Sequence, residues 1–359
     1  MMVATKKVSL FFIITLLSMT YTKNQAAGWQ SIETKFAFIA FPLFVPLFIK
    51  SKKEIHSIFK FLNHIAMAYL LLSVFRMIYL YYTSEDAVSL TGTFLEFKFT
   101  PEAKSLHPTY VSFYFLTLIL FNGNELLNNL TKKREFAFSI LRILAFSIFI
   151  ILLSSKVAFI GLFISVVLLI GKYAIQKGKI KLSILFFLVF SVIAIIGIYN
   201  SNLKIKFEQT YQELTNTNRN PASYVQSTGA RIWFWKTTTE IVSENSLLGV
   251  GTGDIRDELS SKYRAKGIKT IQDKGFDSHQ QYLQTFASLG VFGFVCLLSI
   301  FFLLFYQSVK HKQFVLFGFT LLYFIFGLTE SMLETQAGII FFTFFGLLLY
   351  SINPSKASD

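Results

Sequence analysis

The chain has 359 residues, of which 53% are hydrophobic, 17% aromatic and only 15% charged. Its mean hydropathy of +0.53 excludes an ordinary soluble domain, which needs far more polar residues to cover its surface. The formal net charge of +14 would suit a nucleic-acid-binding protein. The basic residues, however, are spread over short gaps between apolar runs, so we expect no nucleic-acid partner.

The apolar runs predict a bundle of membrane-spanning helices. Strands of a membrane barrel would alternate apolar and polar residues, and runs such as 184–198 do not. We therefore expect an all-α polytopic membrane protein with about ten transmembrane helices. The predicted spans are, in chain order, 8–22, 36–49, 58–82, 108–127, 136–153, 157–173, 182–200, 285–306, 313–330 and 334–352.

The first span has an alternative interpretation as a signal peptide. Lys6 and Lys7 precede a short apolar stretch, and the later Gln25-Ala26-Ala27 resembles a cleavage site. We favour an uncleaved first helix, because the apolar run continues quickly into a second one. Cleavage would not change the sidedness of any later segment.

Basic residues are unequally shared between the alternate gaps that separate the spans. One set of gaps and termini holds fifteen lysines and arginines, whereas the short gaps of the other set hold five. The positive-inside rule places the richer set in the cytoplasm, together with both termini. The long segment 201–284 then lies on the opposite side of the membrane.

Segment 201–284 is far longer than every other gap and carries eleven basic and nine acidic residues. A loop of this length usually has a functional reason, although a passive tether is the alternative. The expected organisation is an N-terminal bundle of about seven helices over 1–200, the loop over 201–284, about three helices over 285–352 and a cytoplasmic tail over 353–359.

Within the loop, Ser227 and Thr228 predict the N-terminal cap of a helix that follows at once. The aromatic run from Trp233 to Trp235 indicates that this helix lies at the level of the lipid headgroups. Arg231 falls in its first turn. There it would meet either ordinary headgroups or the phosphates of a lipid-linked substrate.

The run Gly249-Val-Gly-Thr-Gly-Asp254 predicts a tight turn. It is not a nucleotide-binding P-loop, because no Gly-Lys-Ser/Thr follows. Its backbone N–H groups either cradle phosphate oxygens or serve only the turn, and both interpretations stay open.

A second cap is predicted at Asp277 or Ser278, which would put His279 in the first turn of the helix of the eighth span. A helix N-terminus disfavours imidazolium, so we expect His279 to stay neutral and able to accept a proton, unless its role is structural. No second His or Cys stands at ligand spacing, so we expect no metal site.

Taken together, these motifs resemble the O-antigen ligase and polymerase family. The resemblance rests on Gly229-Ala-Arg231-Ile-Trp-Phe-Trp235, Leu248-Gly-Val-Gly-Thr-Gly-Asp254, His279-Gln-Gln-Tyr-Leu-Gln284 and Gly290-Val-Phe-Gly293, in this order. It is strongest over 229–294 and extends over 105–350.

The resemblance implies a membrane enzyme that transfers a glycan from undecaprenyl diphosphate to an acceptor hydroxyl, at the periplasmic face of a bacterial inner membrane. Acceptors in the family are the lipid A core, a growing polysaccharide, and Ser or Thr of a protein. The implied reaction is inverting and uses no metal or other cofactor. We expect an O-antigen ligase, with a polymerase or protein O-oligosaccharyltransferase as the alternative. A transporter or flippase is less expected, because charges gather in one loop and at helix ends.

The resemblance also implies roles for particular residues. The family's loop arginine corresponds to Arg231, and its loop histidine corresponds to His279, which would act as the base for the acceptor hydroxyl. A Ser-Arg motif of the family reads Ser154-Ser155-Lys156 here, and lysine keeps the charge but loses the bidentate geometry. Gln280 stands where the family often has Asn.

The leaving diphosphate gains negative charge as the glycosidic bond breaks, so the site needs cations. Arg231 and Lys156 are the expected contacts, with Arg264, Lys266 and Arg76 behind them. Arg76 lies in the outer third of its span, where it either has such a role or only reaches out to the interface.

Three further residues are expected to support the site: Glu330, His107 and Trp235. Glu330 and Glu334 flank the last outer turn, where they either orient Arg or His side chains or belong to a solvated turn. His107 precedes Pro108 on the outer face and either helps to bind the donor or simply precedes a helix start.

A topology prediction follows from the charge asymmetry. A reporter fused after Lys179 should read cytoplasmic and one fused after Asn220 should read periplasmic, because lysine and arginine are retained on the cytoplasmic side. Paired alkaline phosphatase and fluorescent-protein fusions measure both. The opposite pair of readings would move the loop to the cytoplasm and remove every role assigned in it.

Overall fold

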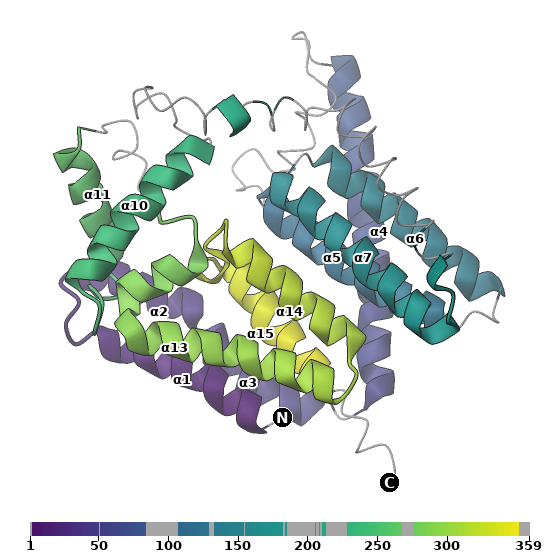
Figure 1. The fold of residues 1–359 in the computed structure, drawn as a ribbon, viewed down its shortest axis with the longest axis horizontal. Coiled ribbons are helices and arrows are strands. Elements are labelled where there is room, and N and C mark those ends of the chain that lie inside the picture. The colour runs from purple at the N-terminus through teal and green to yellow at the C-terminus, as the bar shows by residue number, and fades with distance from the viewer. Residues whose placement is uncertain are drawn as a thin grey trace. The chain divides into compact units, whose positions relative to one another are not determined.

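The computed structural model describes residues 2–49, 51–83, 107–128, 133–153, 155–181, 228–267 and 276–351, with the separate positions 184, 205, 208 and 210–212. All regular structure in these residues is helical, which confirms the all-α part of the predicted fold class (Figure 1). The chain divides into two compact units. The first unit comprises Met1–Lys50 and Glu208–Asp359, and the second comprises Ser51–Phe207.

The first unit joins the N-terminal helices to those that follow the long loop. Its helices are α1 (Met2–Ser18), α2 (Gln25–Lys35), α3 (Ala37–Phe48), α10 (Thr228–Glu244), α11 (Ile255–Ala265), α13 (Gln281–Lys310), α14 (Phe314–Gly327), the 3-10 turn η3 (Met332–Glu334) and α15 (Gln336–Tyr350). Helix α1 packs along α13 and α3, and α14 and α15 pack beside them. Segments from both ends of the sequence therefore build one body.

Aromatic side chains form the core of this unit. Tyr323 of α14 lies 4.5 Å from Phe342 of α15 between ring centroids, and Phe342 lies 5.6 Å from Phe301 of α13. On the other side of α13, Phe11 of α1 meets Phe38 of α3 edge to face at 5.2 Å. Such pairs add about 0.5–1.5 kcal/mol each beyond the apolar area that they bury.

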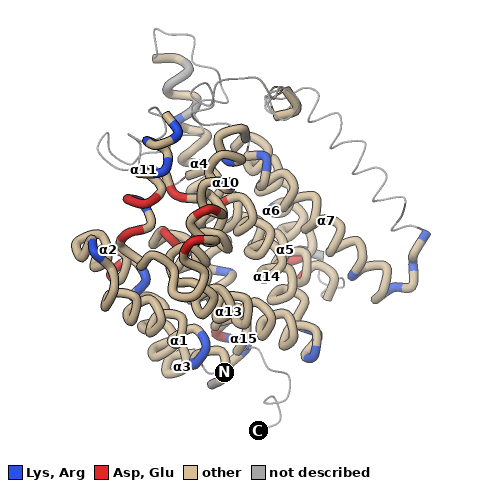
Figure 2. Tube along the Cα trace, turned by 60° about the vertical axis from the view of Figure 1, so that its left-hand side comes forward, with Lys and Arg blue, Asp and Glu red and all other residues tan. Residues whose placement is uncertain are grey.

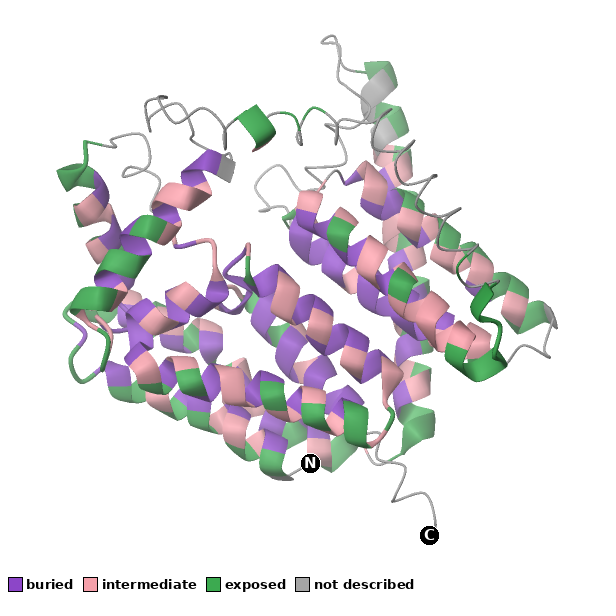
Figure 3. Cartoon of the chain, viewed as in Figure 1, coloured by how far each residue is buried: buried purple, intermediate pink, exposed green. Residues whose placement is uncertain are grey.

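The second unit contains α4 (Lys52–Thr83), α5 (Pro108–Asn128), α6 (Lys133–Leu152) and α7 (Lys156–Lys177). Helix α5 is its centre, because it packs against α4, α6 and α7, and it is mostly buried (Figure 3). Phe121 of α5 stacks on Phe59 of α4 with centroids 4.4 Å apart.

Five helical stretches of the described residues are long and apolar enough to cross a membrane. They are Gln25–Phe48, Lys52–Arg76, Arg134–Leu152, Lys156–Lys177 and Gln281–Lys310; Phe314–Gly327 and Gln336–Tyr350 are shorter apolar helices. The total of ten spans and the sidedness of the loop remain predictions. The predicted span 182–200 lies outside the described residues except for Ile184.

A break inside α13 fixes where the loop meets the helices. Gly290 has φ 63° and ψ −164°, a conformation that is essentially restricted to glycine. Within an intact helix, Val291 would donate its N–H to Ala287. Instead it donates to the carbonyl of Ser246 at 2.9 Å, and the carbonyl of Ala287 accepts from Val250 at 2.9 Å. The segment that follows α10 is therefore held to α13 by backbone hydrogen bonds.

Replacing Gly290 should lower the stability of the folded protein. A Cβ atom at this position would overlap the carbonyl oxygen of Leu247, and the backbone conformation would be strained as well. We expect Gly290→Ala to cost at least about 1–3 kcal/mol, seen as a lower melting temperature of the purified protein in detergent. Gly171→Ala in α7 is the control, since its Cβ would meet no atom within 4 Å beyond its chain neighbours and the backbone of its own helix. Equal melting temperatures for the two variants would contradict the argument.

Candidate functional site

Arg231 lies where the sequence predicted it, in the first turn of α10, which begins at Thr228. Ala230 and Phe234 are buried and belong to an apolar cluster with residues of α11 and α13, so the start of α10 is anchored. The Arg231 guanidinium reaches the turn after α14, where its Nη2 donates to Oε1 of Glu330 at 2.5 Å. This is a short, charge-assisted contact between two elements far apart in the sequence.

His279 does not lie in a helix, so its predicted place in the first turn of α13 is wrong. Helix α13 begins at Gln281, because the side chain of Gln280 accepts the N–H of Leu283 and caps the helix there. His279 instead has a left-handed backbone with φ 46°, and its N–H donates to Oδ1 of Asp277 at 2.8 Å. A local bond between a side chain and the backbone thus holds the turn before the helix.

The imidazole of His279 is held on several sides. Its ring stacks on Phe234 at 5.3 Å between centroids, with the rings inclined by 25°, and Phe276 lies 5.7 Å away. Nδ1 of His279 is 3.4 Å from Oε2 of Glu330 and 3.9 Å from Oδ1 of Asp277. These contacts fix both the orientation of the ring and the nitrogen that faces the carboxylates.

The prediction of a low pKa for His279 is also wrong. Burial lowers the pKa, but the hydrogen bond to Glu330 and the negative charges of Asp277 and Glu330 raise it by more. The positive charge of Arg231 works against them, and the net result is a pKa above the ordinary value of 6.5. The sequence-based prediction placed His279 inside the first turn of the helix and did not include the carboxylates of Asp277 and Glu330.

Glu330 connects the two residues, with Oε1 on Arg231 and Oε2 on His279. Its side chain is only 9% exposed, and Met332 and Leu333 beside it are fully buried. Leu333 donates its N–H to Oε1 of Gln281 at 2.6 Å, which ties this turn to the start of α13. The alternative of a solvated turn is therefore wrong, and Glu330 orients both Arg231 and His279.

Sequence reasoning did not single out a second buried ion pair in the same unit. Lys35, at the end of α2, donates to Oε2 of Glu334 at 2.7 Å and to the hydroxyl of Ser31 at 2.9 Å. The Lys35 side chain is 4% exposed. A signal was present in the sequence, since Lys35 stands in one of the gaps between predicted spans that hold few basic residues.

A polar hollow of about 150 Å³ lies beside this pair. Its lining includes the amides of Gln30 and Gln284, the hydroxyls of Ser31 and Thr34, and the charged groups of Arg256 and Glu334. The carbonyl oxygen of the Gln284 amide accepts the N–H of Ser278 at 3.1 Å, so one wall of the hollow contacts the residue before His279. Its chemistry suits a ligand rich in hydroxyl groups.

The glycine-rich turn serves packing rather than phosphate binding. The N–H groups of Gly249, Val250 and Gly251 donate to backbone carbonyls of the protein, and that of Thr252 donates to the hydroxyl of Ser18. The carboxylate of Asp254 accepts the N–H groups that follow α1 (Lys23 at 2.8 Å and Asn24 at 2.7 Å). Of the two open interpretations, the contacts therefore support the tight turn.

Among the described residues of the loop, further cations lie on or directly after α10 and α11, where acidic residues lie close by (Figure 2). Lys266 is bound by Glu240 at 2.7 Å, so its ammonium already has a carboxylate partner. Arg264 is exposed in the last turn of α11. Trp235 packs against the apolar cluster around Phe234, as a supporting residue of α10.

Three predicted residues belong to the second unit. Lys156 is the first residue of α7, as the Ser-Ser-Lys motif predicts, although Ser154 lies outside the described residues. Arg76 lies in α4, and His107 precedes α5 and accepts the N–H of Thr109 at 3.4 Å. The contacts of the first unit do not test these three, and their roles toward a donor remain predictions.

Residues 141–298 match the family model described as O-antigen ligase. The family resemblance inferred from the loop motifs is thereby confirmed over this part of the chain. The matched segment contains Lys156, Arg231 and His279, whereas Glu330 lies beyond its end. No curated protein matches the chain.

The raised pKa of His279 can be measured without knowing the reaction. Diethyl pyrocarbonate modifies neutral imidazole, so modification of His279 should set in at a pH above 6.5. Glu330→Gln removes a group that raises the pKa, and we expect the onset to move to lower pH. Peptide mass spectrometry after modification at a series of pH values measures this.

The control for this experiment is Glu244→Gln, which removes a surface carboxylate that pairs with Lys262 instead. It should leave the pH dependence of His279 modification unchanged. An unchanged onset in Glu330→Gln would show that Glu330 does not hold the imidazole.

Proposed function

We propose that this protein, whose residues 141–298 match the O-antigen ligase family, transfers a glycan from undecaprenyl diphosphate to an acceptor hydroxyl. The observation that carries the proposal is the shared Glu330 carboxylate, which holds a phosphate-binding group, Arg231, next to a proton acceptor, His279. We propose an O-antigen ligase with lipid A core as acceptor. A polymerase or a protein O-oligosaccharyltransferase would use the same donor and the same chemistry.

In the proposed reaction, Nε2 of His279 takes the proton of the acceptor hydroxyl. Nδ1 faces Glu330, so the Nδ1–H group donates a hydrogen bond to that carboxylate and Nε2 keeps its lone pair. The acceptor oxygen forms a bond to the anomeric carbon as the bond from that carbon to the diphosphate oxygen breaks. The electron pair leaves with undecaprenyl diphosphate, and attack opposite the leaving group inverts the anomeric configuration.

Arg231 is proposed to hold the leaving diphosphate. Its bond to Glu330 uses Nη2, and a guanidinium carries five N–H groups, so that it can hold a carboxylate and a phosphate oxygen together. Because Glu330 offsets the charge of Arg231, further cations are needed for a diphosphate. We propose Lys156, Arg264 and Arg76 for this role, on the family resemblance and their charge. The reaction is proposed to need no metal or other cofactor.

The polar hollow near Gln284 is proposed to receive a sugar ring of the donor or the acceptor. Hydroxyl, amide and carboxylate groups line it, and these are the partners that sugar hydroxyls use. On the predicted topology the site faces the periplasm of the inner membrane, where lipid-linked glycans and their acceptors would meet.

Removing the proposed base or the proposed phosphate contact should reduce transfer. We expect His279→Ala to slow transfer by about 10²–10⁴-fold while donor binding persists. We expect Arg231→Ala to cost about 2–4 kcal/mol in transition-state stabilisation and to weaken donor binding. Lys156→Arg should be tolerated, because it keeps the charge. The assay is transfer from purified undecaprenyl-diphosphate glycan, with donor binding measured in parallel.

Matched controls separate chemistry from folding. Lys236→Ala removes a cation from the same helix as Arg231 that lies over the Trp233 ring, and His311→Ala removes the histidine at the far end of α13. Both should transfer at the normal rate. Normal transfer by His279→Ala, with normal abundance, would remove this residue from the mechanism. The acceptor is identified by deleting the gene and finding which surface glycan loses its attachment or its length.

A further inference from the structure

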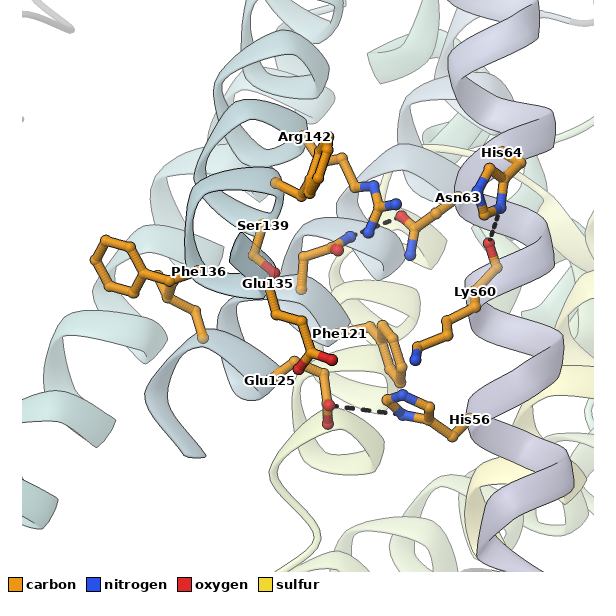
Figure 4. A pocket seen from close by; sticks show the side chains of 13 residues that line it. His56, Lys60, Asn63, His64, Phe121, Glu125, Glu135, Phe136, Ser139 and Arg142 are labelled. Carbon is orange, nitrogen blue, oxygen red and sulfur yellow. Dashed lines mark hydrogen bonds and ion pairs between the residues drawn. The ribbon is translucent and has the colours of Figure 1, made fainter. Parts of the chain in front are cut away.

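A second site lies in the second unit, apart from the residues discussed so far. It is a pocket of about 220 Å³ between α4, α5 and α6 (Figure 4). The charged and polar groups that matter are Lys60, Asn63, Glu125, Glu135 and Arg142. A pocket of this size holds far more than one water molecule, which needs about 10–15 Å³.

The deepest polar group of the pocket has an unused donor. Asn63 is 1% exposed, and its Oδ1 accepts a hydrogen bond of 2.7 Å from Nδ2 of Asn122. Asn122 is itself fixed, because the same Nδ2 donates to the carbonyl of Leu118 at 2.7 Å. The Nδ2 of Asn63 is buried without a partner. A buried N–H without a partner destabilises the fold, so this donor calls for a ligand with an acceptor oxygen.

Charges of both signs line the pocket. Arg142 and Asn63 point into one part of it, whereas Lys60 extends from α4 toward His56 and Phe121 (Figure 4). The carboxylates of Glu125 and Glu135 point into another part, where Glu125 lies 3.6 Å from Nδ1 of His56. A ligand that fits must carry negative oxygens at one end and a positive group at the other.

The surroundings of the pocket indicate that such a ligand comes from the lipid bilayer. The pocket lies near the ends of its helices, close to where α4 and α6 begin and α5 ends. Apolar side chains on the same helices are exposed, with Phe61 at 65%, Ile65 at 48% and Phe138 at 47%. Polar pockets between transmembrane helices beside such apolar surface suit lipid headgroups, whose acyl chains then lie along the helices.

We propose that this pocket binds the headgroup of phosphatidylethanolamine from the surrounding bilayer. The phosphate accepts hydrogen bonds from Arg142 and Nδ2 of Asn63, and the ammonium donates to Glu125 and Glu135. The headgroup of phosphatidylglycerol is anionic and has no ammonium group that could pair with the two carboxylates. A choline headgroup carries no N–H to donate to them.

The experiment uses the full-length protein, purified in detergent and stripped of lipid. Phosphatidylethanolamine, phosphatidylglycerol and phosphatidylcholine with identical acyl chains are added in equal amounts, and the bound lipid is counted by native mass spectrometry. Inorganic phosphate and water-soluble phosphoethanolamine are added in separate arms. We expect the wild type to retain phosphatidylethanolamine in preference to the other two lipids.

Two variants test the two ends of the headgroup. Arg142→Gln should weaken retention roughly tenfold, the loss expected for one charged hydrogen bond. Glu135→Gln should remove the preference for ethanolamine over choline. The control is Arg134→Gln, which changes an exposed arginine of the same helix that lies over the Phe138 ring and should leave retention unchanged.

Several results would overturn the proposal. Equal retention of the three lipids would do so, as would retention that Arg142→Gln does not change. Binding of phosphate or phosphoethanolamine as tight as that of the lipid would show that the occupant is a soluble compound.

Discussion

The carboxylate of Glu330 is almost completely removed from solvent, and an ionised carboxylate in such a place needs charged or hydrogen-bonding partners. Its partners, Arg231 and His279, come from segments 99 and 51 residues away in the sequence. The ion pair therefore constrains three elements at once: the start of α10, the turn before α13 and the turn after α14. If any of the three moved, a charge would be left buried without compensation, which is costly.

The elements themselves could be predicted from the sequence, because apolar runs and caps are local signals. The Ser227-Thr228 pattern predicted a helix that follows at once, and α10 begins at Thr228. Apolar length predicted described helices such as Lys156–Lys177 before the loop and Gln281–Lys310 after it. The start of α13 could not be predicted in the same way. Asp277, Ser278 and Gln280 are all capable of capping, and Gln280 prevails because Asp277 bonds instead to the N–H of His279.

Residue types of the site could be predicted from the sequence, but their electrostatics could not. The motifs pointed to Arg231 and His279, whereas Glu330 was only one of two acidic residues beside a turn. Its role depends on contacts with Arg231 and His279, which are distant in the sequence, and no local sequence pattern predicts such contacts. The pKa of His279 is raised because the two nearby carboxylates raise it by more than burial and Arg231 lower it. The direction of this shift therefore also depends on contacts that the sequence does not reveal.

The sharing of one carboxylate between a cation and an imidazole also couples donor binding to proton transfer in the proposed reaction. Arg231 lowers the pKa of His279, and Glu330 raises it. A diphosphate bound to Arg231 would add negative charge near the pair and offset the effect of the guanidinium. The imidazole would then become a stronger base when the donor is in place. If the imidazole becomes a stronger base when the donor binds, the acceptor hydroxyl is deprotonated mainly while a glycan donor is present for the acceptor oxygen to attack. The buried position of Glu330 makes this coupling effective, because charges interact more strongly where water is excluded.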